Sequence, residues 1–194
     1  MNRGSALGVR YSGRGSRIAN LEYRTPIFIC VHLWRYKSLS LQLPVDGAPR
    51  KITSDMGDPR GGGKRRHKGV DFDGPRGEPV RAVTDGVIEF AGVDLRRGTS
   101  KLLTPKESKS FDKKLMGNGG FMVIIRHDEG LTSAYMHLDD YNVVRGQAVK
   151  RGALIGHVGR TGISESPAHL HFEFRADGRH LDPMPLFGDL VFKP

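Results

Sequence analysis

The chain has 194 residues, of which 37% are hydrophobic and 27% are charged, and this balance predicts one soluble, globular domain with its own core. The single cysteine, Cys30, excludes an internal disulfide and any zinc or redox motif built from cysteines. The net charge of +10 is concentrated near the N-terminus, where residues 1–51 carry nine Lys and Arg against two Asp and Glu.

The N-terminal part of the chain differs in composition from the rest. We predict a basic N-terminal segment, residues 1–42, that is partly disordered, followed by a folded domain over residues 43–194. A basic arm of this kind contacts nucleic acid, anionic lipid or an anionic wall polymer, or it remains a solvated tail. The longest apolar stretch, residues 26–34, is too short to span a bilayer, so we expect no transmembrane segment. It is followed by Arg35-Tyr36-Lys37 and is therefore a poor signal peptide.

Beyond residue 43 the pattern is typical of a β-rich protein. Short runs rich in Val, Ile, Phe and Tyr alternate with Gly, Pro and Asp turns. The predicted strands are Pro79–Ala82, Gly86–Gly92, Phe121–His127, Leu131–His137, Leu154–Val158 and His169–Arg175. We therefore expect a β-dominated fold of antiparallel sheets.

One segment interrupts this succession of strands. Thr104 and Glu107 form a capping-box pattern with Pro105 at the first helical position, which predicts a short exposed helix over residues 105–116. Because strands flank it on both sides, we interpret this helix as part of an insertion at the tip of a loop, over residues 94–117.

The segment His169–Arg175 alternates strictly between polar and apolar residues. On a strand, this alternation places Leu170, Phe172 and Phe174 on one face and His169, His171, Glu173 and Arg175 on the other. Two imidazoles on one face of a strand are close enough to serve a single site. The alternative is a pair of solvated histidines on a polar face.

Two further segments offer side chains of the same kind. His67 and Asp71 lie four residues apart in a glycine-rich, extended segment and would share a face. His137 ends a predicted strand. Taken alone, each of these side chains is also compatible with a purely structural role. Together, two imidazoles and one carboxylate are a suitable ligand set for a catalytic zinc, which leaves a position free for water. The His-Glu-x-x-His helix of another class of zinc peptidases is absent.

These segments carry a resemblance to a known family. The motifs His67-Lys68-Gly69-Val70-Asp71, Tyr135-Met136-His137-Leu138 and His169-Leu170-His171-Phe172-Glu173 look like those of the lysostaphin and LytM family of cell-wall metalloendopeptidases. Intervening segments follow the family pattern in the same order, so that the resemblance covers roughly residues 43–188.

The resemblance implies more than the composition does. It implies a sandwich-like open barrel with a groove, and one Zn²⁺ per chain held by His67, Asp71 and His171. By motif position, His137 and His169 become the catalytic histidines, without an indication of which one is the base. The implied function is hydrolysis of peptide cross-links or bridges in bacterial peptidoglycan. We expect a monomer without a specific nucleic-acid partner, in the periplasm or at the cell wall.

The chain also departs from the family pattern. The loop 164–168 is one residue longer than usual, Asp55-Met56 stands where Gly-Phe is common, and the insertion 94–117 leaves the substrate preference open. Two other functions remain to be distinguished: a non-catalytic relative that binds the wall or activates an amidase, and nucleic-acid binding through the basic arm. The first typically lacks the zinc ligands, and the second would show a strong dependence on salt.

Overall fold

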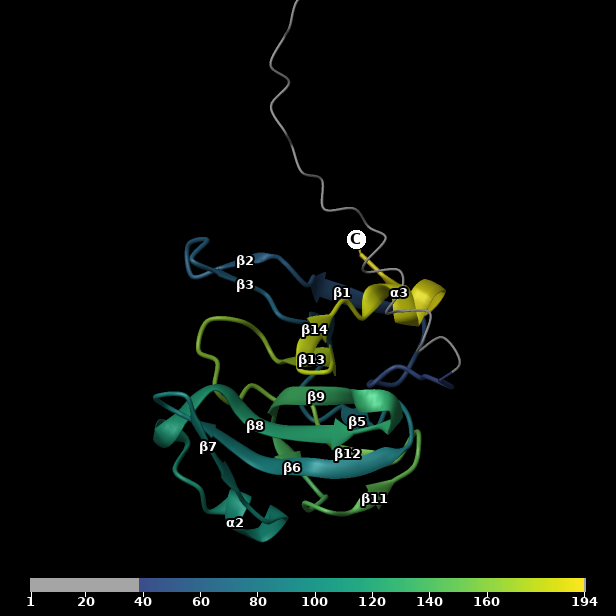
Figure 1. The fold of residues 1–194 in the computed structure, drawn as a ribbon. Coiled ribbons are helices and arrows are strands. Elements are labelled where there is room, and N and C mark those ends of the chain that lie inside the picture. Colours follow the sequence, from purple (N-terminus) through teal and green to yellow (C-terminus); the bar gives the residue numbers. More distant parts are fainter. Residues whose placement is uncertain (1–38, 194) are drawn as a thin grey trace, which may run out of the picture.

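Strands are the predominant secondary structure of the described chain, because its short runs of β-branched and aromatic residues are separated by turns rich in glycine (Figure 1). The computed structural model describes residues 39–193. Its strands are β1 (Arg50–Ser54), β2 (Pro59–Arg60), β3 (Arg65–Arg66), β4 (Val70–Asp73), β5 (Pro79–Arg81), β6 (Gly86–Leu95), β7 (Thr99–Leu102), β8 (Met116–Arg126), β9 (Leu131–Leu138), β10 (Asp140–Tyr141), β11 (Ala148–Val149), β12 (Leu154–His157), β13 (His169–Ala176), β14 (Arg179–Leu181) and β15 (Val191–Phe192). The six predicted strands correspond to β5, β6, β8, β9, β12 and β13. Four of them match to within one residue, but β6 continues to Leu95 and β8 begins at Met116, so both extend into the predicted insertion.

The strands form one large, twisted sheet and two small ones. The large sheet has the order β11-β6-β8-β9-β13-β4-β1-β15, with β7 added at β6 and β14 at β13. Strands β10, β12 and β5 make a second sheet, and β2 and β3 make a hairpin. Neighbouring strands are antiparallel except for β1 and β15, which are parallel. The expectation of a β-dominated fold is confirmed, and the large sheet remains open within the described residues.

The core lies against the large sheet. Its largest fully buried side chains come from β4, β8, β9 and β13, and they include Tyr135, Phe72, Phe121, Phe172 and Phe174. Phe172 contacts the rings of Tyr135, Phe72 and Phe174 in edge-to-face geometry, with centroids 4.8 to 6.1 Å apart. The apolar face predicted for His169–Arg175 is therefore buried, and the opposite face of β13 is left for the site.

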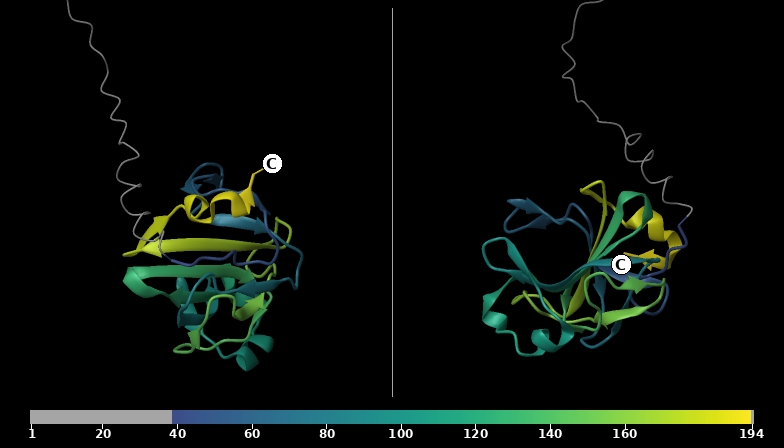
Figure 2. Two further views of the ribbon diagram at one scale, coloured as in Figure 1. Left: turned by 90° about the vertical axis from the view of Figure 1, so that its right-hand side faces the viewer. Right: turned by 60° about the horizontal axis from the view of Figure 1, so that its bottom comes forward.

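The predicted helix is shorter than expected. Helix α2 covers only Pro105–Lys109, and its capping box between Thr104 and Glu107 is present. The chain then leaves the helix at Ser110, and a 3-10 turn, Lys113–Leu115, leads directly into β8. Phe111 contacts the core ring of Phe121 instead of continuing an exposed helix. A second helix, α3 (Met184–Phe187), lies at the opposite end of the fold from α2 (Figures 1 and 2).

The predicted N-terminal segment, residues 1–42, lies outside the described residues except for its last four. Of these, Gln42 donates its backbone N–H to the carbonyl of Val83 at 3.0 Å, and Leu39 and Leu41 pack against the core. The boundary at residue 42 therefore stays a prediction. Among residues 39–193, no helix has the length and apolar character needed to cross a membrane.

Candidate metal centre

Asp71 and His171 lie directly opposite each other on two adjacent strands. Strand β4 pairs with β13 in antiparallel register, and Asp71 and His171 are partners in that register. Directly opposed residues of an antiparallel pair project from the same face of the sheet, with Cβ atoms about 4.5–5.5 Å apart. The pairing of these two strands therefore brings a carboxylate and an imidazole together from positions 100 residues apart.

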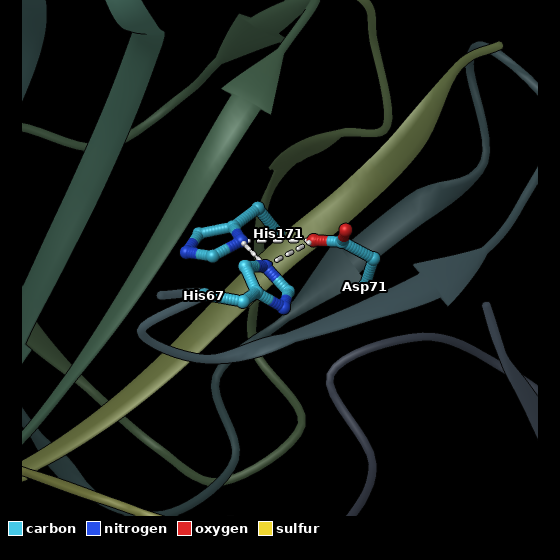
Figure 3. Close-up of side chains that lie close together, drawn as sticks. All are labelled: His67, Asp71 and His171. Atoms are coloured by element: carbon cyan, nitrogen blue, oxygen red, sulfur yellow. Dashed lines mark hydrogen bonds and ion pairs between the residues drawn. The ribbon is translucent and has the colours of Figure 1, made fainter. Parts of the chain in front are cut away.

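His67 joins them from the segment between β3 and β4. Its Nε2 lies 2.8 Å from His171 Nδ1 and 3.1 Å from Asp71 Oδ1, and His171 Nδ1 lies 2.8 Å from the same oxygen. Figure 3 shows the three side chains pointing toward one another. All three are buried, with exposed fractions of 7 to 8%. The structure thus brings together the three ligands predicted from the sequence.

The outer hydrogen bonds of the two imidazoles determine which nitrogens carry a proton. His67 Nδ1 lies 2.7 Å from the carbonyl oxygen of Asp55, which can only accept, so this nitrogen donates. His171 Nε2 lies 3.1 Å from Glu173 Oε1 and donates to that carboxylate. In the neutral rings, His67 Nε2 and His171 Nδ1 therefore both direct lone pairs at the centre. Histidines that bind metals are oriented in this way by their second nitrogen.

The charges of the cluster favour an additional cation. Burial acts to raise the pKa of Asp71, but the interactions with His171 and His67, whose facing nitrogens donate when a ring takes up a second proton, outweigh it and hold the pKa well below its usual range. Burial acts to lower the pKa of His171, yet the hydrogen bonds to Asp71 and Glu173 raise it above its ordinary value. Two lone pairs and a buried carboxylate oxygen thus attract positive charge, which a proton or a metal ion can supply.

The donor set meets the requirements of zinc. Two imidazole nitrogens and one carboxylate oxygen are the ligands of many catalytic zinc sites. Donors bound to one tetrahedral zinc at about 2.0–2.2 Å stand about 3.3–3.6 Å apart. The three atoms are slightly closer than this, so only a small outward movement would accommodate the ion.

Behind His171 lies a carboxylate that the sequence motifs did not predict to be part of the site. Glu173 is buried, and its Oε2 accepts two hydrogen bonds from Arg175 at 2.8 and 2.5 Å. His180 Nε2 lies 3.2 Å from the same oxygen. Burial acts to raise the pKa of Glu173, but His171 and Arg175 lower it to about 2. Glu173 lies two residues after His171 and on the same face of the strand, so its place beside the site is recognisable from the sequence.

A second supporting residue leaves no recognisable pattern in the sequence. Arg60, in the β2–β3 hairpin, donates to Asp71 Oδ2 at 2.8 Å and to Ser54 Oγ at 2.8 Å. These contacts hold one carboxylate oxygen of Asp71 away from the centre and leave Oδ1 facing the two imidazoles. Arg60 therefore orients the candidate ligand without competing for the position of the metal.

The two predicted catalytic histidines lie beside this centre. The rings of His137 and His169 are 5.0 Å apart, and the ring of His137 is 5.8 Å from that of His171. His137 Nδ1 lies 3.1 Å from the carbonyl of Thr161, and His169 Nδ1 lies 2.9 Å from that of Pro167. Both Nδ1 atoms therefore donate to carbonyls, so each neutral ring keeps a lone pair on Nε2.

His137 is held in an unusual environment. Burial, and then the neighbouring His171 and His169, lower its pKa to about 3, so the ring is neutral near pH 7. Its backbone has φ of 64°, a left-handed conformation that non-glycine residues adopt rarely and at an energetic cost. Such strain is concentrated at functional sites, which is consistent with the place of His137 beside the metal centre.

Comparisons with known proteins agree with this geometry. Residues 65–183 match the model of peptidase family M23. A DD-carboxypeptidase/endopeptidase of Neisseria meningitidis is 37% identical over 120 residues, covering 62% of this chain and 22% of the relative. A murein hydrolase activator, NlpD of Salmonella dublin, is 30% identical over 154 residues, covering 79% of this chain and 31% of the relative. The chain thus spans about a fifth to a third of the length of these two proteins.

A solved structure extends the likeness to the fold. The catalytic domain of the antimicrobial peptidase lysostaphin from Staphylococcus simulans is 31% identical, with a TM-score of 0.55, over 72% of this chain and 93% of that domain. The resemblance read from the three motifs is therefore confirmed. The chain belongs to peptidase family M23.

Proposed function

We propose that this chain is a zinc-dependent endopeptidase that hydrolyses peptide cross-links or bridges of bacterial peptidoglycan. The observation that carries the proposal is the convergence of His67 Nε2, Asp71 Oδ1 and His171 Nδ1, all within 2.8 to 3.1 Å of one another. Zinc bound by these atoms supplies Lewis acidity, which makes water a nucleophile at neutral pH. The substrate class is supported by the names of the relatives and of the lysostaphin structure.

The remaining steps belong to side chains of this protein. His137 and His169 each offer an Nε2 lone pair beside the centre, and these two atoms take up or return the proton of the attacking water. A protonated imidazole at either position also stabilises the negative charge that develops on the oxygen of the cleaved bond. Arg60 and Glu173 keep Asp71 and His171 in place while this happens.

The site also bears on the non-catalytic alternative, which the likeness to a murein hydrolase activator raises. The described chain has three candidate ligands, two further histidines beside them, and a hydrogen bond that orients each of these five side chains. A protein that only binds the wall has no need for this arrangement. We therefore place the protein among the hydrolases of the family and propose that it acts as a monomer in the periplasm or at the cell wall.

A direct experiment is digestion of purified cross-linked wall peptides, with products identified by mass, in the presence and absence of a chelator. We expect cleavage that the chelator stops and added zinc restores. The His171→Ala variant serves as the matched control for a contaminating hydrolase. Cleavage that survives both the chelator and this substitution would refute a zinc-dependent mechanism at this site.

A further inference from the structure

An open cleft of about 890 Å³ lies next to the candidate catalytic histidines. Thr161, whose carbonyl accepts from His137 Nδ1, lines this cleft, and so does Asp139, two residues after His137. Figure 1 shows the loop before β13, the β6–β7 turn and the start of β8 on one side of the fold, together with the β2–β3 hairpin. A peptide lying across the catalytic centre can therefore extend into this cleft.

The insertion 94–117 forms one wall of the cleft. Half of the lining residues belong to it, namely Asp94, Leu95, Arg96, Arg97, Gly98, Lys113, Met116 and Gly117. The opposite wall is the loop that begins at Arg160, and the two walls meet where Gly162 contacts the backbone of residues 117–120. The insertion, which leaves the substrate preference open from sequence, thus lines the same cleft as Thr161, the residue whose carbonyl contacts His137.

The charge of the cleft is predominantly positive. Arg76, Arg96, Arg97, Lys113 and Arg160 line it, against the two carboxylates of Asp94 and Asp139. A surplus of cations in a partly enclosed cleft attracts anions and excludes other cations. A ligand can bind only to those charged side chains that are not already paired within the protein.

Most of the charges are already engaged within the protein. Arg76 pairs with Asp139 at 2.6 Å. Arg160 donates to the carbonyls of Ser164 and Ser166 and thereby holds the loop before β13. Asp94 Oδ2 accepts the backbone N–H of Gly119 at 2.8 Å.

Two cations are left for a ligand. Arg96 donates its Nε weakly, at 3.4 Å, to the carbonyl of Met116. Within residues 39–193, neither the Arg97 nor the Lys113 side chain makes a hydrogen bond or ion pair, and both are exposed at the cleft. Arg97 has φ of 74°, a left-handed conformation in which glycine and asparagine are far more common. This conformation is typical of the tight hairpin loop between β6 and β7, and the loop places the unpaired guanidinium at the cleft.

We propose that this cleft binds a free carboxylate of the peptide substrate and that Arg97 and Lys113 supply the charge that recognises it. Guanidinium groups bind carboxylates through two parallel hydrogen bonds, and a lysine adds a compact charge. Peptide groups are neutral, so a free carboxylate is the part of a peptide that these cations distinguish. The inference rests on the proposed peptidase function and adds a specificity site to it.

The test compares cross-linked stem-peptide dimers that carry free carboxylates with two amidated forms. In one form the C-terminal carboxylate is a carboxamide, and in the other the side-chain carboxylate is a carboxamide. We expect the full-length wild-type protein to cleave the free-carboxylate dimer with a kcat/KM about tenfold higher than one of the amidated forms. The form that is cleaved more slowly identifies the carboxylate, and higher ionic strength should reduce the preference.

The decisive variant is Arg97→Asn combined with Lys113→Gln. Asparagine tolerates the left-handed conformation, so the turn after β6 is preserved. We expect the ratio of kcat/KM values for free and amidated peptides to fall close to one. The matched control is Lys106→Met, which removes a cation from the same insertion but from outside the cleft. Its ratio should equal that of the wild type.

The possible outcomes distinguish a failure of the proposed carboxylate site from a failure of the proposed peptidase function. If the wild type cleaves all three peptides equally well, or if the double variant keeps the preference, the carboxylate site is refuted while the peptidase stands. If zinc-loaded wild type cleaves none of them, the proposed function fails and the inference fails with it. Zinc content and thermal unfolding of each variant show that changes in rate do not reflect a damaged fold.

Discussion

His67 Nε2 and His171 Nδ1 lie 2.8 Å apart although 104 residues separate them in the chain. Each ring donates its other N–H outward, to the Asp55 carbonyl and to Glu173, so the two facing atoms are lone pairs when the rings are neutral. Facing lone pairs beside the Asp71 carboxylate repel one another unless a cation lies between them. The fold therefore holds these three groups in an arrangement that favours added positive charge.

The first prediction concerns His171, the candidate ligand on β13 that lies opposite Asp71 on β4. His171→Ala removes one of three donors and leaves Asp71 and Glu173 without their common hydrogen-bond partner. We expect zinc binding and peptide cleavage to be lost together, since a catalytic zinc site needs its three protein ligands. Metal analysis after dialysis against a limiting zinc concentration measures this. A variant that retains one zinc per chain would show that the ligand assignment is incorrect.

The second prediction separates a catalytic residue from a ligand. His137 contacts the rings of His169 and His171 but is not among the three converging donors. In His137→Ala we expect the zinc content of the wild type and a fall in kcat of about 10²–10³. Turnover at the wild-type rate would remove His137 from the mechanism, and loss of zinc would make it a ligand.

The third prediction concerns the carboxylate behind His171. Glu173→Gln keeps the size of the side chain but weakens the acceptor that orients the imidazole, so zinc affinity should fall about 10–100-fold. The control is Glu78→Gln, which alters another glutamate paired with an arginine, Arg50, outside the cluster of donors. Competition with a fluorescent zinc chelator gives both affinities. Equal affinities in the two variants would mean that Glu173 does not support the metal.

A fourth prediction tests a buried histidine away from the site. His127 Nδ1 contacts the Asp85 carbonyl at 2.7 Å, and its Nε2 lies 2.8 Å from Ser133 Oγ. Burial lowers the pKa of His127, which is therefore neutral in the folded protein at pH values where it is protonated in the unfolded chain. Below about pH 6.5, the unfolded state binds more protons, so the free energy of unfolding decreases as the pH falls.

His127→Gln should remove this contribution. Urea unfolding of zinc-loaded protein between about pH 8 and about pH 5 should show a smaller loss of stability in the variant than in the wild type. The contributions of the metal site are common to both proteins and cancel in the difference. Parallel pH dependences would show that His127 is protonated in the folded protein as readily as in the unfolded chain.

Local patterns in the sequence predicted most of the longer strands. Val, Ile, Phe and Tyr runs between glycine-rich turns identify β5, β6, β8, β9, β12 and β13, because both propensity and alternation act within a few residues. The alternation in His169–Arg175 also predicted that His171 and Glu173 share a face, and their contact of 3.1 Å shows that they do. The strands β1, β2, β3, β4, β7, β10, β11, β14 and β15 were not predicted, and all of them except β1 have only two to four residues.

The register between strands could not be read from residue patterns alone. Asp71 lies opposite His171 because β4 pairs with β13, and the pairing of distant strands depends on the whole sheet. His137 is a second case. Met136 is the register partner of His171, so a regular strand would turn His137 to the other face, toward the core. The φ of 64° at His137 breaks this alternation, and its ring lies 5.8 Å from that of His171.

Local sequence patterns also did not predict where helix α2 ends within the insertion. A good capping box predicted the start of α2 correctly, but not its end after Lys109, where Phe111 turns toward Phe121. Tertiary contacts of this kind override helix propensity. Arg60 was missed for a similar reason, because its contact with Asp71 depends on how the β2–β3 hairpin folds back over the site.

The most direct test of the account is a crystal structure of the zinc-loaded protein with anomalous diffraction recorded at the zinc edge. We expect a single strong peak bonded to His67 Nε2, Asp71 Oδ1 and His171 Nδ1, with His137 and His169 beside it but unbonded. A peak bonded to another set of side chains, or no peak at this position in protein that cleaves peptides, would contradict the assignment of the centre.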